Sequence, residues 1–207
     1  MEKKMDESKT RRKILDAAKT EFLQKGFQTA SLRNIVKNAG VTTGAFYGYF
    51  SNKEALFTAL VEEHATTIMG RYMQVQEAFT ELPREEQPGH MGKESAGYLD
   101  WMIDYIYEHF DIFKLIICCS EGTAYAGFIH TMVEVEVEAT FKFIEVLRSL
   151  GHDIPEIDRQ FCHIVCSGMF TGIFEMVVHD MPQEYAHAYA SQLQKFHTAG
   201  WAEILGI

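Results

Sequence analysis

Hydrophobic positions recur along most of this chain at helical spacing. One stretch, Val133–Glu138, alternates apolar and acidic residues, a pattern that taken alone is typical of a strand. Its flanks continue at helical spacing, from Ile129 to Leu147, and no second strand candidate is present to pair with it. We therefore predict an all-α fold. The predicted helices cover residues 10–25, 31–39, 43–49, 53–80, 94–109, 111–120, 126–150, 155–180 and 183–205.

Residues 31–57 predict two short helices around a tight turn. Ser31 is a good N-cap, because its hydroxyl can accept a hydrogen bond from an amide of the first turn. Gly40 stands where the chain reverses, and glycine adopts a left-handed backbone without steric cost. Thr42 can cap the second helix, which carries Phe46 inward. Helix, glycine turn and helix form the helix-turn-helix layout of DNA-binding proteins.

The same region resembles the N-terminal domain of the tetracycline-repressor (TetR) family of bacterial transcriptional regulators. The resemblance covers about residues 10 to 60 in order and spacing. It rests on Gly26-Phe27, Ala39-Gly40-Val41, Tyr47, Phe50 and Lys53-Glu54-Ala55-Leu56. It implies an N-terminal three-helix DNA-binding domain over residues 1–55. It also implies an antiparallel helical bundle over residues 56–207 for ligand binding and dimerisation.

Charge is divided unevenly along the 207 residues, whose net charge is −10. Residues 1–55 carry eleven Lys and Arg against six Asp and Glu, whereas the remaining chain carries eight against 23. Neutralising phosphates needs a local basic surface rather than a basic protein. We therefore expect DNA contacts to be confined to the first quarter of the chain.

A recognition helix presents small or polar groups to base edges and longer donors to phosphates. By resemblance, Lys53 matches a position that usually holds phosphate. The polar residues of the predicted recognition helix could be plain surface of a three-helix bundle. Exposed tyrosines beside threonines and glycines instead favour a surface that binds a partner. The candidate DNA-binding residues are Arg33, Thr42, Thr43, Gly44, Ala45, Tyr47, Tyr49 and Lys53.

The second domain is expected to supply a dimer interface and a ligand pocket. The resemblance implies a homodimer through the last two helices, about residues 155–180 and 183–205. Aromatic residues concentrate between Tyr98 and Phe128, where they can line an apolar pocket or equally fill a core. The candidate ligand-binding residues are Trp101, Tyr105, Tyr125, Phe128, His130, Met132, Glu134, Phe170 and Phe174.

No metal ion or cofactor is expected. Cys162 and Cys166 lie one helical turn apart beside His163, which fits a zinc or thiol sensor, but buried cysteines more often act as small apolar fillers. No nucleotide loop, nucleophile elbow or two-histidine zinc motif is present, so an enzyme is not predicted.

The sequence shows neither a secretory signal nor a run of 18 apolar residues, so we expect a cytoplasmic protein. The resemblance implies that this protein is a homodimeric regulator. The resemblance implies a repressor that leaves a palindromic DNA operator when a small apolar or aromatic effector binds. Ligand would shift helix 53–80 and change the spacing of the two recognition helices. A ligand-independent architectural DNA-binding protein, or an activator of the same fold, stays open as an alternative. The architectural alternative predicts a filled C-terminal core.

Overall fold

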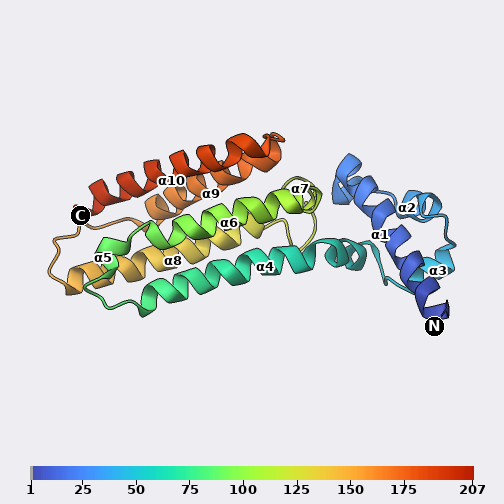
Figure 1. The fold of residues 1–207 in the computed structure, drawn as a ribbon, viewed down its shortest axis with the longest axis horizontal. Helices are drawn as coiled ribbons and strands as arrows, with labels where there is room; N and C mark the ends of the chain where they lie inside the picture. Colours follow the sequence, from blue (N-terminus) through green and yellow to red (C-terminus); the bar gives the residue numbers. More distant parts are fainter. Residues whose placement is uncertain (1) are drawn as a thin grey trace. The chain divides into compact units, whose positions relative to one another are not determined.

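The computed structural model describes residues 2–207, with side chains described for residues 9–92 and 97–207. Ten helices and no strand occur within these residues, which confirms the predicted all-α fold. Figure 1 shows the helices, coloured in chain order from blue to red. They are α1 (Glu2–Thr29), α2 (Leu32–Asn38), α3 (Thr43–Tyr47), α4 (Lys53–Glu81), α5 (Gln87–His90), α6 (Lys93–Glu108), α7 (Phe110–Cys118), α8 (Phe128–Ser149), α9 (Arg159–Val178) and α10 (Gln183–Leu205).

The chain divides into two compact units. The first comprises residues up to Thr66 together with His109–Ala126, and the second comprises Thr67–Glu108 and Gly127–Ile207. The sequence predicted a single boundary after residue 55. The structure instead groups the start of α4 and all of α7 with the N-terminal helices, because α7 packs against α1.

The first unit has an aromatic centre beneath the helix-turn-helix. Phe22 and Phe57 are fully buried and meet edge to face, with ring centroids 5.2 Å apart. Phe27 completes this cluster at 5.8 and 5.4 Å from the two rings. Gly26 interrupts α1 with φ of 68° and ψ of 164°, which turns the backbone just before Phe27. The rings thus fix the last turn of α1 against α4.

The second unit is a bundle of long helices. In Figure 1, α6, α8, α9 and α10 run roughly alongside one another with the second half of α4. Contacts join α8 to α9, α9 to α10 and α10 to α6. The alternating stretch Val133–Glu138 lies within α8, so its helical assignment is confirmed. Phe174, Met132 and Leu147 are among the fully buried side chains that hold the bundle together.

Several boundaries differ from the prediction for local reasons. The backbone of α1 is already helical at Glu2, well before the predicted start at residue 10. The segment between the predicted helices 53–80 and 94–109 contains the short helix α5. Helix α9 begins after Asp158, whose carboxylate accepts hydrogen bonds from the backbone N–H groups of Gln160 and Phe161 at 2.9 and 3.0 Å. A capping carboxylate therefore sets this start, rather than the earlier Pro155.

Candidate functional site

Two capped helices form the helix-turn-helix in the first unit. The Ser31 hydroxyl accepts from the backbone N–H of Asn34 at 3.4 Å, and Thr42 Oγ1 accepts from that of Ala45 at 3.1 Å. Gly40 lies between the helices with φ of 65°, the left-handed conformation that the reversal requires. Both capping roles and the glycine turn agree with the sequence pattern.

Helix α3 has a buried side and an exposed side. Phe46 on α3 is buried, and so is Phe50, three residues beyond the end of the helix. The Tyr47 side chain, in contrast, is 55% exposed and packs edge to face on Phe46 at 5.2 Å. Thr43 and Gly44 are exposed as well. The packing of Phe46 therefore fixes which residues α3 leaves open to a partner. All eight predicted DNA-binding residues are exposed or half-buried. Seven of them lie on α2, on α3 or directly beside α3: Arg33, Thr42, Thr43, Gly44, Ala45, Tyr47 and Tyr49.

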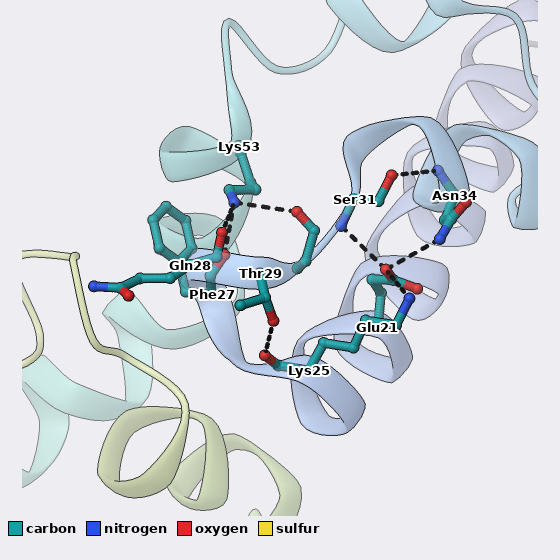
Figure 2. Close-up of polar contacts among 9 residues, drawn as sticks. Glu21, Lys25, Phe27, Gln28, Thr29, Ser31, Asn34 and Lys53 are labelled. Atoms are coloured by element: carbon teal, nitrogen blue, oxygen red, sulfur yellow. Dashed lines mark hydrogen bonds and ion pairs between the residues drawn. The ribbon is translucent and has the colours of Figure 1, made fainter.

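Lys53, the remaining predicted DNA-binding residue, binds within its own unit (Figure 2). Its ammonium donates to the carbonyl oxygens of Phe27 at 2.6 Å, Gln28 at 3.1 Å and Ala30 at 3.1 Å. Nζ also lies 4.6 Å from the centroid of the Phe27 ring. An ammonium group has three donors, so these carbonyls can engage all of them. Lys53 thereby ties the start of α4 to the connection between α1 and α2, a role that sequence reasoning missed.

Glu21 anchors the start of α2 from the opposite side (Figure 2). Its Oε1 accepts from the Ser31 backbone N–H at 3.0 Å and from Asn34 Nδ2 at 3.4 Å, and it pairs with Lys25 at 3.1 Å. The hydrogen bond from Ser31 is the main reason that the pKa of Glu21 lies below its ordinary value. Only 4% of Glu21 is exposed. An acidic residue within the apolar stripe of α1 was the sequence signal that could have revealed this buried anchoring role.

The second unit contains a cavity of about 540 Å³. Helices α4, α8, α9 and α10 supply most of its wall, with further residues from α5 and α6. Apolar side chains such as Phe79, Phe143 and Ile173 alternate with polar ones such as Gln194 and Thr198. The volume falls within the range of about 300–1,000 Å³ that is typical of small-molecule sites.

Glu136 forms the polar centre of one cavity wall. The Tyr72 hydroxyl and Gln76 Nε2 both donate to its Oε2, the latter at 2.8 Å. Among the described residues, Oε1 has no hydrogen-bond partner. Burial raises the pKa of Glu136, and burial is also the main cause of the raised pKa of Tyr72. The wall therefore offers a carboxyl oxygen to a ligand in apolar surroundings.

Cys166 also lines the cavity, one turn from Cys162 on α9. Both thiols are free and buried. The pKa of Cys166 is raised, because its thiol is hydrogen-bonded to Cys162 and buried. A thiol with a raised pKa is a poor metal ligand and a poor nucleophile. The burial and the raised pKa of Cys166 favour for this residue the filler role that the sequence suggested.

The predicted ligand-binding residues do not come together around this cavity. Phe170 lines it, with its ring 5.7 Å from that of Tyr72. The other eight lie elsewhere. Trp101 and Tyr105 stack on each other at 5.2 Å, and Arg71 lies 4.1 Å from the Trp101 ring.

The remaining candidates are distributed over the core and the surface. Phe128 and Phe174 pack edge to face at 6.0 Å in the buried core. Tyr125 belongs to the first unit, where it contacts Phe57 at 6.2 Å. Met132 is fully buried, and the two polar candidates, His130 and Glu134, lie on α8 beside His163 of α9. Sequence reasoning missed Tyr72, Gln76 and Glu136, although a glutamate beside the apolar stripe of α8 was a readable signal.

Comparison with known proteins agrees with the helix-turn-helix geometry. The profile of the family described as bacterial regulatory proteins, tetR family, matches residues 14–60. The uncharacterized HTH-type transcriptional regulator YdgC of Bacillus subtilis is 44% identical over 54 residues, 26% of this chain and 28% of that protein. The A-factor receptor protein of Streptomyces griseus is 25% identical over 170 residues, 79% of this chain and 53% of that protein. The matched segments thus span less than two thirds of these relatives' own lengths.

The fold recurs along nearly the whole chain. The fatty acid degradation regulator FadR from Bacillus halodurans superposes with a TM-score of 0.56 at 16% identity, covering 91% of this chain and 98% of that one. An N-terminal helix-turn-helix joined to a helical bundle defines a class of DNA-binding regulators. Within that class, residues 14–60 of this chain match the DNA-binding region of the TetR family of regulators.

Proposed function

We propose that the protein is a homodimeric repressor that binds a palindromic DNA operator and leaves it when a small molecule enters the cavity. The observation that carries this proposal is the pairing of an exposed helix-turn-helix in one unit with a cavity of about 540 Å³ in the other. An architectural protein of the same fold would need no such cavity. The cavity therefore favours a ligand-responsive protein over a ligand-independent one.

The DNA-binding surface of the proposal is the exposed side of α3 with neighbouring basic residues. Thr43 and Tyr47 are free of the core and can reach base edges and phosphates. Arg33 and Lys37 on α2 are exposed cations of the same unit. Lys53 supports this surface by holding the start of α4, rather than by offering its ammonium to DNA.

The dimer interface of the proposal comprises the exposed apolar side chains of α9 and α10. Ile164 on α9 is 68% exposed and Phe196 on α10 is 73% exposed. Phe161 on α9 and Tyr185 on α10 are exposed as well. Large apolar groups left in water favour association with a second copy. Two-fold symmetry then supplies the second helix-turn-helix that a palindromic operator requires.

The same exposed apolar surface explains a feature of α9. Among the described residues, α9 is the one helix that is long and apolar enough to cross a membrane by length and composition. Its buried face packs against α8. We propose that a second protein copy covers its other face, and that the protein acts in the cytoplasm, where its operator lies.

The effector of the proposal has an apolar or aromatic body and a hydrogen-bond donor. Phe79, Phe143 and Phe170 would pack against the body, and the free oxygen of Glu136 would accept from the donor. One relative is named an A-factor receptor protein, which supports a receptor role for this chain. At 25% identity, the identity of that ligand is not carried over.

Helix α4 is the element through which the effector would act. Its first residue, Lys53, is bound to the helix-turn-helix unit, and Tyr72 and Gln76 near its other end line the cavity. A ligand that binds the DNA-incompetent state more tightly shifts the equilibrium by that difference in affinity. A coupling of about 1–3 kcal/mol changes operator affinity roughly 5- to 150-fold.

The test is selection of genomic DNA fragments by the purified protein, followed by footprinting of the tightest fragment and a ligand screen by thermal shift. A short palindromic footprint, released by compounds that raise the unfolding temperature, supports the proposal. Ala139→Phe, which narrows the cavity, should abolish release, whereas Trp101→Leu outside the cavity should not. Diffuse, salt-labile binding without a footprint contradicts it and favours an architectural protein. A reporter gene distinguishes repression from activation.

A further inference from the structure

Three metal-ligating side chains meet on the surface of the second unit, between α8 and α9. They are His130 and Glu134 on α8 and His163 on α9, and their ligand atoms all lie within 4.8 Å of one another. No other group of three or more His, Cys, Asp or Glu side chains meets this condition among the described side chains. We propose that this His130–Glu134–His163 cluster binds a zinc-type divalent transition-metal ion.

The backbone already brings the ligands to one point. His130 and Glu134 are four residues apart, so they lie on the same face of α8. Glu134 Oε1 lies 3.3 Å from His163 Nε2, and the two imidazole rings are 5.7 Å apart. Zinc bonds of about 2.0–2.2 Å place ligand atoms roughly 3.4 Å apart in a tetrahedron. Side-chain rotations that move the ligand atoms by roughly 1 Å therefore complete the site. The side chain of His130 is exposed and can make such a movement.

A further contact orients the His163 ring. Its Nδ1 lies 3.4 Å from Ser167 Oγ, one turn further along α9. When Nε2 binds a metal, Nδ1 carries the hydrogen and donates it to this hydroxyl. Metal-bound histidines almost always have such a partner on the other ring nitrogen, because it fixes the tautomer and the ring orientation. The geometry around His163 thus has the second partner that a metal site needs.

The donor set determines the class of ion. Two imidazole nitrogens and one carboxylate oxygen suit zinc, with a further position open to water. Magnesium and calcium prefer oxygen ligands throughout, so this set selects against them. The nearby guanidinium of Arg159 pairs with Glu138, one turn beyond Glu134, so its positive charge is already compensated.

Binding would cross-link two helices of the bundle. His163 precedes Ile164, which belongs to the apolar surface that we propose as the dimer interface. An ion held by α8 and α9 would fix the position of α9 and stabilise the folded chain, since it binds the native state. The inference does not depend on DNA binding or on the cavity, because the three ligands lie outside both.

The experiment is a titration of the full chain, first stripped with a chelator, with Zn²⁺ by calorimetry and with Co²⁺ by visible absorption. We expect about one ion per chain and a Co²⁺ spectrum without a thiolate charge-transfer band. His130→Ala, His163→Ala and Glu134→Gln should each weaken binding at least about tenfold. Zn²⁺ should raise the unfolding temperature of the unchanged protein. It should not raise the unfolding temperature of any of these three variants.

Two matched controls make the result specific. His179, directly after the end of α9, pairs with Glu175 of that helix at 2.7 Å but has no third ligand, so His179→Ala should leave binding unchanged. Replacing Cys162 and Cys166 by serine should also leave it unchanged. The proposal is overturned if no Zn²⁺ binds, if the ligand variants bind as well as the unchanged protein, or if binding is lost with the cysteines. Circular dichroism checks folding, and should His163→Ala unfold, the exposed His130→Ala decides between these outcomes.

Discussion

The hydroxyl of Tyr72 on α4 donates a hydrogen bond to Glu136 Oε2 on α8, at the wall of the cavity. The bond joins two helices that are distant in the sequence, and it places a carboxyl group where little solvent reaches it. A carboxylate in such surroundings is compensated by hydrogen bonds or takes up a proton. Tyr72 and Gln76 supply part of that compensation, and a bound effector would supply more.

Glu136→Gln tests the cost of this buried carboxyl group. The pKa of Glu136 is raised in the folded protein, so the folded state binds the proton more tightly than the unfolded state does. The contribution of Glu136 to stability is therefore fully present below the unfolded pKa, about 4.3, and is lost as the pH rises through the folded pKa. We expect Glu136→Gln to be more stable than the unchanged protein at neutral pH. Denaturant unfolding at several pH values measures the difference.

The advantage of Glu136→Gln should vanish near pH 4, roughly where both states of the glutamate become protonated. Glu138→Gln is the matched control, because Glu138 lies on the same helix but is exposed. Its effect on stability should be small. A Glu136→Gln protein that is less stable at neutral pH would show that the hydrogen bonds from Tyr72 and Gln76 outweigh burial.

Local interactions made the helix-turn-helix predictable. The caps at Ser31 and Thr42 and the turn at Gly40 depend on neighbours within a few residues, and the structure shows each of them. The helical reading of Val133–Glu138 succeeded for the same reason, since its flanks carry the helical period. Which of the exposed residues on α3 touch DNA remains a prediction.

The cavity could not be predicted in this way. Periodicity shows which face of a helix is apolar, but a void depends on how side chains from several helices fit together. Trp101 packs against Tyr105, and Phe128 packs against Phe174. These aromatic rings therefore contact each other instead of lining the cavity. The role of Lys53 was equally hidden, because its acceptors are backbone carbonyls of another helix end.

Lys53→Met should destabilise the first unit. It removes three hydrogen bonds from a charged donor, and bonds to charged groups contribute about 1.5–3 kcal/mol each, so we expect a loss of at least about 2 kcal/mol. Urea unfolding measures it. Lys37→Met is the control, because Lys37 is exposed on α2. We expect that variant to lose operator affinity without losing stability. If the stability of Lys53→Met is unchanged, the three hydrogen bonds are not what Lys53 contributes. That result would favour the phosphate contact that the resemblance implies.

Ile164→Glu tests the proposed dimer interface. Ile164 is 68% exposed in the single chain, so a charge there costs little until a second copy covers it. In the interface the buried carboxylate would lack a partner, and we expect dimer affinity to fall at least about tenfold. Light scattering after size exclusion measures the mass. Met73→Glu is the control, since Met73 is similarly exposed on α4, outside the proposed interface. Equal effects of both changes would contradict the assignment.

Tyr47→Ala tests the DNA-binding surface. The ring is 55% exposed and rests against Phe46, so its removal takes little from the core. We expect operator affinity to fall about tenfold or more, while the dimer state and the unfolding midpoint stay close to those of the unchanged protein. Fluorescence anisotropy with the footprinted operator gives the affinity. Tyr185→Ala is the matched control, because that exposed tyrosine lies on α10, in the proposed dimer interface. Tyr185→Ala should weaken the dimer, and it should weaken DNA binding only as a consequence. At protein concentrations that keep this variant dimeric, its operator affinity should equal that of the unchanged protein. Tyr47→Ala should show no such recovery, and unaltered operator affinity in that variant would count against α3 as the DNA-reading helix.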